Sequence, residues 1–308
     1  VVKKGQRIAS ANAKVFAPVH SSLSGKVLAI QNWPHPVAGK GRAVVIENDG
    51  LDFSEPVKAR SEEEVRSLSP AQIQRIVMEA GVVGMGGAAF PTHLKLTPVN
   101  PIKTLIINCA ECEPFLTGDF RLMVEKTREI VQGIKIVAQC LRVSDILIAV
   151  EDNKPEAVER FSRECPVGSG IQVKVLKSMY PQGGEKTLIK NALKKEVPRG
   201  KLPFDIGVVV QNVGTVYAVY EAVYYHKPLY ERVVTVAGSC LTNPKNLLVR
   251  IGTPIKNLIE FCGPVSEEPA KIVIGGPMMG LAQYSDSVPV IKSTTGVIFF
   301  NKKEAVDF

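Results

Sequence analysis

A run of glycines near residue 85 is the segment best suited to holding an anionic ligand. Gly84, Gly86 and Gly87 lie in GVVGMGGAAFPTHLKL, residues 81–96. Glycines let the backbone approach a ligand closely and aim several amides at one phosphate. The spacing also fits a dinucleotide-binding fingerprint, but that motif comes after a strand and opens a helix. Here a predicted helix precedes the glycines, and Pro91 interrupts any helix after them. We therefore expect a phosphate cradle of another kind, with a ligand-free turn as the alternative.

Three further segments place polar groups where a predicted strand ends or a predicted helix begins. Ligands of parallel sheets gather at the carboxyl ends of strands, and helix N-termini attract anionic or hydroxyl-rich groups. The groups so placed are Asn108, Glu111 and Glu113 in NCAECEP, Tyr180, Gly184 and Glu185 in YPQGGEKTL, and Asn212 and Thr215 in QNVGT. Each segment is ordinary by itself, and a solvated acidic loop is the plainer interpretation of NCAECEP.

Residues 1–58 consist of short β-like runs separated by turns, which predicts a small all-β module. Within it, APVHSSLSGKV (residues 17–27) resembles the half-repeat of biotinyl- and lipoyl-type barrel-sandwich domains. Lys26 could be proposed as the modified lysine of such a carrier. It follows Gly25 at a strand entrance and lacks the flanking pattern of a hairpin tip. We therefore interpret the module as a barrel sandwich without a carrier lysine.

Residues 60–226 alternate between strand-like and helical patterns. Ser69 is a suitable helix N-cap, and Pro70 suits the first helical position. The apolar runs are 105–108, 146–150, 171–176 and 206–211, and the helical stretches are 119–142, 154–164, 184–195 and 214–224. This alternation predicts βαβ units around a parallel, Rossmann-like sheet.

Residues 227–285 are predicted to form a compact β-grasp-like module. The strand-like runs RVVTVAGS and LLVRIG, a helical stretch at 254–262 and the run KIVIGG give a β-β-α-β order. Residues 286–308 are expected to add one or two strands and a linker. The fold class is therefore α/β, with a barrel-sandwich module before the parallel-sheet core and a β-grasp module after it.

Composition limits the classes of partner. With 308 residues and 45% hydrophobic content, the chain can form two or three cores. No apolar run reaches the roughly 18 residues that span a bilayer. The first residues, VVKKGQRIAS, lack an initiator Met and a signal-peptide pattern, so we expect the chain to begin inside a domain. The net charge of +8 favours acidic partners, but its spread along the chain argues against nucleic acid.

The six cysteines do not have the spacing of a metal or cluster site. Only Cys109 and Cys112 are close in sequence, and no second pair is present at a spacing that would complete a tetrahedral set. We expect buried or loop thiols in a reducing cytoplasm, and no metal site within these residues.

Taken together in this order, the four motifs resemble the flavin and NADH site of the respiratory complex I flavoprotein. Its patterns are G-x-G-G-x-G-F-P-T-G-x-K, N-A-D-E-x-E-P, C-G-E-E-T and N-N-V-E-T, and the match covers roughly residues 65 to 275. The resemblance implies noncovalent FMN bound by Gly84, Gly86, Gly87, Lys95, Asn108, Glu111, Glu113, Tyr180, Gly184, Glu185, Asn212 and Thr215. It also implies NADH contacts from Phe90, Glu113, Lys201 and Phe204.

Four substitutions depart from these patterns. Ala89 and His93 replace glycines, Ala110 replaces an aspartate, and Lys186 replaces the second glutamate of the third motif. They affect the NADH contacts more than the FMN cradle, and fewer acidic groups could raise the flavin potential.

The segments around this core resemble the RnfC family, which belongs to the Rnf ferredoxin:NAD oxidoreductases. They are APVHSSLSGKV, the form YPQGGEKTLI, and Gly-Gly-Pro-Met-Met-Gly at 275–280. The resemblance implies a peripheral protein on the cytoplasmic face of the membrane. Its partners would be NAD(H), other Rnf membrane subunits, an iron–sulfur subunit and ferredoxin. Two [4Fe-4S] clusters of the family are expected only in a C-terminal part beyond these residues.

The implied activity is reversible hydride transfer between NAD(H) and FMN, followed by single-electron transfer to iron–sulfur centres outside the chain. No catalytic side chain is required, because the flavin does the chemistry. Two alternatives stay open. One is a non-catalytic assembly scaffold, and the other is a flavoprotein of the cobalamin-reductase type.

Overall fold

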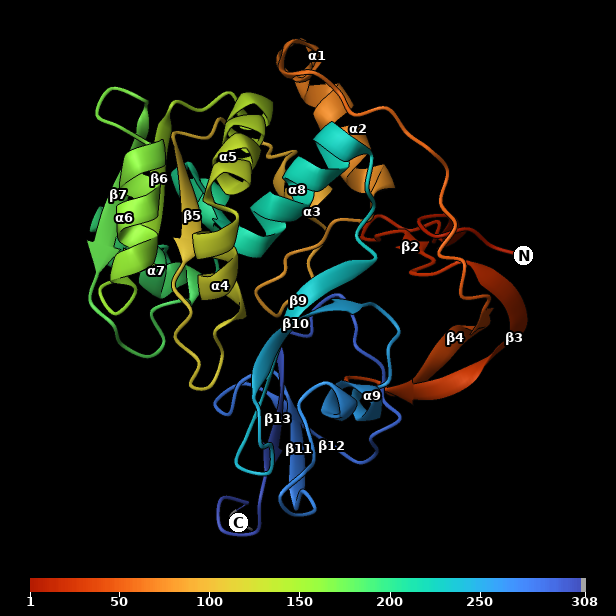
Figure 1. Cartoon of the computed structure of the whole chain (residues 1–308). Coiled ribbons are helices and arrows are strands. Elements are labelled where there is room, and N and C mark those ends of the chain that lie inside the picture. Colours follow the sequence, from red (N-terminus) through yellow and green to blue (C-terminus); the bar gives the residue numbers. More distant parts are fainter. Residues whose placement is uncertain (306–308) are drawn as a thin grey trace.

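The computed structural model describes residues 1–305, which form three modules that pack against one another (Figure 1). The N-terminal module is all-β. Its strands pair antiparallel in two ribbons, and they are β1 (Arg7–Ala9) with β2 (Val19–His20) and β3 (Gly25–His35) with β4 (Gly39–Asn48). The sequence predicted short strands separated by turns, because Gly and Pro residues lie between the β-like runs.

The central module is a four-stranded parallel sheet in the order β7-β6-β5-β8. Its strands are β5 (Thr104–Cys109), β6 (Asp145–Glu151), β7 (Ile171–Leu176) and β8 (Val208–Asn212). Its helices are α1 (Glu62–Arg66), α2 (Pro70–Glu79), α3 (Thr92–Lys95), α4 (Gly118–Glu125), α5 (Thr127–Leu141), α6 (Pro155–Glu164), α7 (Glu185–Leu193) and α8 (Val213–Tyr225), with a 3₁₀ turn at Pro203–Ile206. The predicted parallel α/β core is confirmed.

Two apolar clusters cover the faces of this sheet. Leu105 and Ile107 of β5 point into the larger cluster, with side chains of α2, α5, α6 and α8, whereas Ile106 points into the cluster beneath α7. Alternate residues of a strand face opposite sides, so a strand buried on both sides is apolar throughout. For this reason the apolar runs in the sequence predicted core strands.

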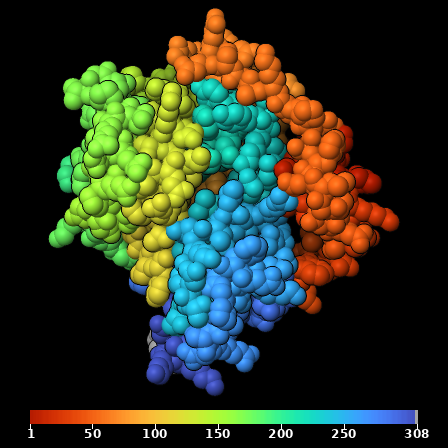
Figure 2. All heavy atoms as spheres, viewed as in Figure 1, coloured from red at the N-terminus to blue at the C-terminus, as the bar shows by residue number. Residues whose placement is uncertain are grey.

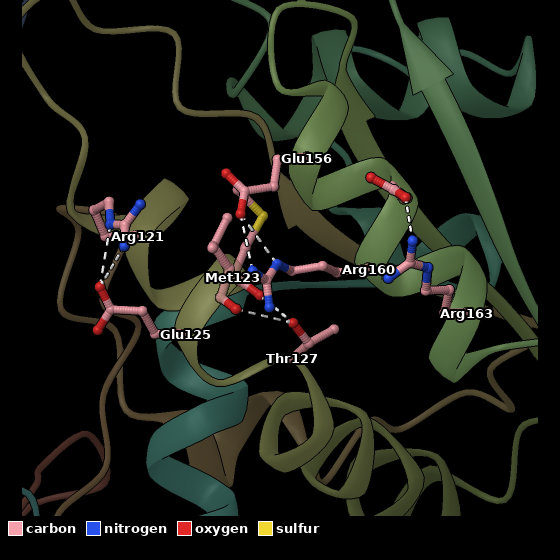
Figure 3. A network of polar contacts seen from close by, with 9 residues as sticks. Arg121, Met123, Glu125, Thr127, Glu156, Arg160 and Arg163 are labelled. Carbon is pink, nitrogen blue, oxygen red and sulfur yellow. Dashed lines mark hydrogen bonds and ion pairs between the residues drawn. The ribbon is translucent and has the colours of Figure 1, made fainter.

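The predicted helix 119–142 is interrupted. Lys126 leaves the helical conformation with φ −127° and ψ 30°, so α4 ends at Glu125 and α5 begins at Thr127. The Thr127 hydroxyl donates to the Met123 carbonyl at 2.6 Å, and so takes the place of a helical amide (Figure 3). The surrounding side chains form i,i+4 ion pairs such as Arg121 with Glu125, which support each helix separately.

The predicted N-cap of α2 is confirmed. The Ser69 hydroxyl accepts a hydrogen bond from the Gln72 backbone amide, and the Ser69 backbone amide donates to the side-chain oxygen of Gln72. Pro70 is the first residue of the helix.

The C-terminal module is a five-stranded sheet in the order β10-β9-β13-β11-β12 with one helix. Its elements are β9 (Glu231–Ala237), β10 (Lys245–Arg250), α9 (Ile255–Glu260), β11 (Lys271–Ile274), β12 (Leu281–Gln283) and β13 (Gly296–Phe300). The expected β-β-α-β order is present. The segment 286–308, predicted as strands and a linker, supplies β13, which lies between β9 and β11 and pairs parallel with β9. A boundary at residue 285 would therefore divide a single sheet; residues 306–308 of that segment lie outside the described part of the chain.

Polar contacts join the N-terminal and C-terminal modules. Trp33 donates its indole N–H to the Ser287 carbonyl at 3.2 Å, and Arg250 pairs with Asp52 at 2.8 Å. In Figure 2 the C-terminal module, in blue, lies against both the red N-terminal module and the yellow α4 region. Within residues 1–305, none of the helices has the length and apolar character needed to cross a bilayer.

Candidate functional site

Two asparagines mark the carboxyl edge of the parallel sheet. Asn108 is the last residue but one of β5, Asn212 is the last residue of β8, and the two are register partners. They lie side by side because parallel strands bring their carboxyl ends to one edge. The glycine-rich loop lies over this edge, since the Cβ of Asn212 is 3.5 Å from the position of a Cβ on Gly86.

The glycine-rich loop closes on itself through backbone hydrogen bonds. The Gly84 amide donates to the Phe90 carbonyl at 2.8 Å, and the Ala89 amide donates to the Gly84 carbonyl at 3.1 Å. Gly86 and Gly87 are exposed between these bonds. Gly87 has φ +111°, and a Cβ there would meet no described atom within 4 Å. The loop therefore presents open backbone to solvent at the sheet edge.

Met85 anchors this loop through both its backbone amide and its backbone carbonyl. Its amide donates to the Thr215 hydroxyl at 2.9 Å, and its carbonyl accepts from the Arg232 guanidinium at 3.1 Å. Thr215 was predicted at the site. Arg232 was missed, because it comes from the C-terminal module and nothing in its local sequence points to the loop.

Asn212 connects the cap of α8 to a partly buried pair of carboxylates. Its oxygen accepts from the amides of Gly214 and Thr215, and its amide nitrogen donates to Asp119 at 2.6 Å. Glu111 accepts from the Asp119 amide at 2.9 Å. Burial, and then the charge of Asp119, raise the pKa of Glu111 to about 7. Asp119, whose pKa burial also raises, was not predicted from the sequence.

The loop after β7 is fitted tightly against the loop after β5. Asn108 donates to the Gly183 carbonyl at 2.9 Å, and the Gly183 amide donates to the Cys112 sulfur at 3.3 Å. A Cβ on Gly183 would lie 2.7 Å from the Ala110 carbonyl oxygen, so a side chain there would displace the loop. The second glycine, Gly184, caps α7.

Lys95 and Glu185 form an ion pair at the start of α7. The Lys95 ammonium lies 2.7 Å from the carboxylate of Glu185 and also donates to the Val210 carbonyl at 3.1 Å. Both side chains are about one-third exposed. The structure thus brings two of the predicted residues together beside β8, where the pair bridges α3 and α7.

Glu113 contacts the C-terminal module. Its carboxylate accepts from the Met278 amide at 3.0 Å, and the Tyr180 hydroxyl lies 3.5 Å from its other oxygen. A Cβ on Gly276 would lie 2.1 Å from the carboxylate, so only glycine fits there. The Gly-Gly-Pro-Met-Met-Gly segment singled out in the sequence therefore forms one wall around Glu113.

The predicted NADH residues fall on opposite edges of the sheet. Phe90 belongs to the glycine-rich loop, and its side chain is 42% exposed. Lys201 and Phe204 lie in the segment that enters β8 at its amino end. β8 runs from that end to Asn212, so Lys201 and Phe204 lie before the opposite end of this strand. Their contact with the dinucleotide stays a prediction.

A cavity of about 360 Å³ lies among the loops that come after β5, β6 and β7. Glu111 and Glu113 line it, together with Glu151 at the end of β6. Glu151 is 1% exposed, and one of its oxygens finds no hydrogen-bond donor among the described residues. Burial raises its pKa, and the Lys154 ammonium lies 3.8 Å away.

The four departures from the family patterns differ in their surroundings. Ala89 has φ +51°, a left-handed conformation that favours glycine. His93 is buried and packs against Phe16 with ring centroids 5.8 Å apart. Ala110 lies against Gly183, and Lys186 is exposed on α7.

The cysteines are free thiols, as expected. Five are buried and Cys112 is partly buried. Among residues 1–305 no group of three or more His, Cys, Asp or Glu side chains has the arrangement of a metal site.

Three family models match the three modules. They are the RnfC barrel sandwich hybrid domain over residues 1–51, the Nuo51 FMN-binding domain over residues 77–221, and the SLBB domain over residues 233–282. The central match contains the glycine-rich loop and both sheet-edge asparagines.

Solved structures share the fold. A crystal structure of NAD⁺-reducing [NiFe]-hydrogenase in the H₂-reduced state superimposes with a TM-score of 0.64 and 20% identity. The match covers 80% of this chain and 50% of that chain. At this identity the likeness is one of fold alone.

Sequence relatives are much closer. The C subunit of the proton-translocating ferredoxin:NAD(+) oxidoreductase complex of Clostridium ljungdahlii is 45% identical over 99% of this chain and 67% of its own length. The Na(+)-translocating counterpart of Acetobacterium woodii is 41% identical over 99% of this chain and 70% of its own length. The C subunit of the ion-translocating oxidoreductase complex of Rhodobacter capsulatus is 41% identical, and the match covers 59% of it. The chain therefore belongs to the RnfC family, the C subunits of the Rnf ferredoxin:NAD(+) oxidoreductase complexes.

Proposed function

We propose that the chain binds FMN at the carboxyl edge of its parallel sheet and exchanges a hydride with NAD(H) there. The observation that carries the proposal is the anchored glycine-rich loop, whose exposed Gly86 and Gly87 lie over the edge formed by Asn108 and Asn212. The family is one of electron-transfer subunits, and oxidoreductase activity belongs to the complex as a whole.

The residues at this edge suit the chemical groups of a flavin mononucleotide. Open backbone at Gly86 and Gly87 matches a phosphate, which accepts hydrogen bonds from several amides at once. The amide side chains of Asn108 and Asn212 and the ion pair of Lys95 with Glu185 offer donors and acceptors to hydroxyl groups and ring edges. When bound, FMN supplies the conversion between two-electron and one-electron transfer.

Side chains at the rim would align the nicotinamide. Phe90 presents an exposed ring that can stack on a flat ligand, and Glu113 is held in place by Tyr180 and the amide of Met278. Hydride transfer requires aligned rings close together, so these groups act through orientation and exclusion of water. We infer no protein acid or base for this step.

We propose further that the chain works at the cytoplasmic face of the membrane as a peripheral subunit. Membership in a multi-subunit complex supports partners of this kind. Other membrane subunits of the complex, an iron–sulfur subunit and ferredoxin would be its neighbours. Two [4Fe-4S] clusters would lie in a part of the relatives beyond the matched region.

A flavin titration tests the proposal. FMN fluorescence should be quenched saturably on adding the protein, and anaerobic NADH should then bleach the flavin absorbance. Gly87→Asp should abolish binding because it places a carboxylate in the phosphate cradle. Gly168→Asp is the matched control, since Gly168 also has positive φ and open space but lies before β7. Absence of binding by the unmodified chain would refute the proposal and favour a docking scaffold.

A further inference from the structure

Arg232 ties the C-terminal module to the glycine-rich loop. It lies on β9 and is only 4% exposed. One guanidinium nitrogen donates to the Met85 carbonyl at 3.1 Å, and another donates to the Lys292 carbonyl. A charged group this deeply buried must be matched by acceptors, and here those acceptors are backbone carbonyls of two modules. Burial lowers the pKa of Arg232 to about 10, and the charge of Asp119 opposes that shift, so the group stays cationic at neutral pH.

Lys292 binds the chain at Gly81, four residues before Met85. Its ammonium donates to the Gly81 carbonyl at 2.6 Å and to the Pro18 carbonyl at 2.7 Å. It therefore joins the N-terminal module to the residue that leads into the loop. Gly81 permits this contact, because a Cβ there would lie 2.3 Å from the Pro18 oxygen and 2.7 Å from the Lys292 nitrogen.

The loop is thus fixed at two points by cations that belong to a different module. Between those points, the Met85 amide is bound by Thr215. The exposed glycines come immediately after Met85, so their direction depends on the orientation of the Met85 peptide. Asp119 partly offsets the charge of Arg232, and Asp119 itself is bound by Asn212.

We propose that Arg232 and Lys292 are positioning residues for the phosphate of the flavin. They fix the glycine-rich loop with its amides toward the phosphate, and they place two positive charges behind it. This inference rests on the proposed function and extends it, because the cradle is then incomplete without the C-terminal module. Phosphate recognition would be a property of two modules and not of the parallel-sheet core alone.

The test compares FMN with riboflavin, which lacks the phosphate. The dissociation constants of the full chain for both flavins are measured by fluorescence quenching for Arg232→Met and Arg232→Lys. Arg232→Met should weaken FMN binding by about tenfold or more, the size expected for losing one charge-assisted hydrogen bond, and should weaken riboflavin binding much less. Arg232→Lys should recover part of the loss. Arg250→Met is the matched control, since Arg250 also belongs to this sheet and bridges to the N-terminal module.

Equal weakening of FMN and riboflavin in Arg232→Met would overturn the proposal, because it would indicate a merely structural role. Unchanged FMN binding would overturn it as well. If Arg232→Met does not fold, Lys292→Met provides the same comparison with the same expected result.

A second readout requires no flavin. Hydrogen exchange at the Met85 amide should accelerate in Arg232→Met and stay unchanged in Arg250→Met. If the unmodified chain failed to bind FMN, the proposed function would fail while this exchange measurement still tested the positioning role. Equal exchange in both variants would refute that role.

Discussion

Replacing Glu111 by Gln should remove a pH dependence from the stability of the protein. The carboxylate accepts from the amides of Asp119 and Phe120 at the start of α4, at 2.9 and 3.1 Å. Burial, with Asp119 as the second cause, raises its pKa from 4.5 to about 7. Between these two values the folded protein holds a proton that the unfolded chain releases.

The sign of the effect comes from that difference in bound protons. A carboxyl group with a raised pKa stabilises the fold below about pH 4.5, and that stability is lost as the pH rises through about 7. The difference of 7 − 4.5 = 2.5 pKa units corresponds to about 3–4 kcal/mol at most, at about 1.4 kcal/mol per unit. Glu111 and Asp119 influence each other's protonation, so the pKa values seen in the titration belong to the pair and not to either carboxyl group alone.

The free energy of unfolding should be measured by urea denaturation of the flavin-free protein from pH 5 to pH 8. The unmodified protein should lose more stability across this range than Glu111→Gln, because other buried carboxyl groups with raised pKa values, such as Glu151, remain in the variant. A constant offset of about 1 kcal/mol is expected in the variant, because the two amides bind different carboxylate oxygens and glutamine replaces one of those oxygens by an NH2 group, which cannot accept. Glu125→Gln, which alters an exposed ion pair with Arg121 near the end of α4, should keep the original slope. A Glu111→Gln protein with the original slope would refute the reasoning.

Three other predictions concern single positions. Gly133→Ala should cost about 1–3 kcal/mol in urea denaturation, since a Cβ would lie 2.3 Å from the Val216 carbonyl oxygen where α5 crosses α8; an unchanged midpoint would contradict this packing. Phe90→Ala should change stability by less than about 0.5 kcal/mol, because the ring is 42% exposed, yet should slow flavin reduction by NADH in stopped-flow absorbance. An unchanged rate would show that Phe90 does not contribute to the site. Lys95→Met should weaken FMN binding by about tenfold in fluorescence titration, as it frees Glu185 beside the sheet edge; equal affinity would show that the ion pair is only structural.

The parallel core was predictable because its strands are apolar on both faces. The four runs between residues 105 and 211 became β5 to β8, since few other structures bury such short apolar segments. The interruption at Lys126 was not predictable from periodicity. It depends on a threonine hydroxyl bonding to the Met123 carbonyl, and threonine also occurs within unbroken helices.

The candidate site was predictable where it is local and not where it is assembled over distance. Asn108 and Asn212 were predicted because each lies at the carboxyl end of a strand. Asp119 and Arg232 were missed because their importance comes from partners far along the chain, such as the carbonyl of Met85. The contact of Phe204 with NADH stays a prediction, because a motif gives the order of residues and not the edge of the sheet on which they lie.

The place of β13 in the C-terminal sheet has a consequence for folding during synthesis. Residues 296–300 lie between β9 and β11, so both of those strands keep an unpaired edge until the ribosome has released this late segment. The parallel-sheet core can complete its own pairings about eighty residues earlier. A nascent chain halted between these points would present a finished core beside an open sheet, and that stage is where aggregation or chaperone capture should concentrate.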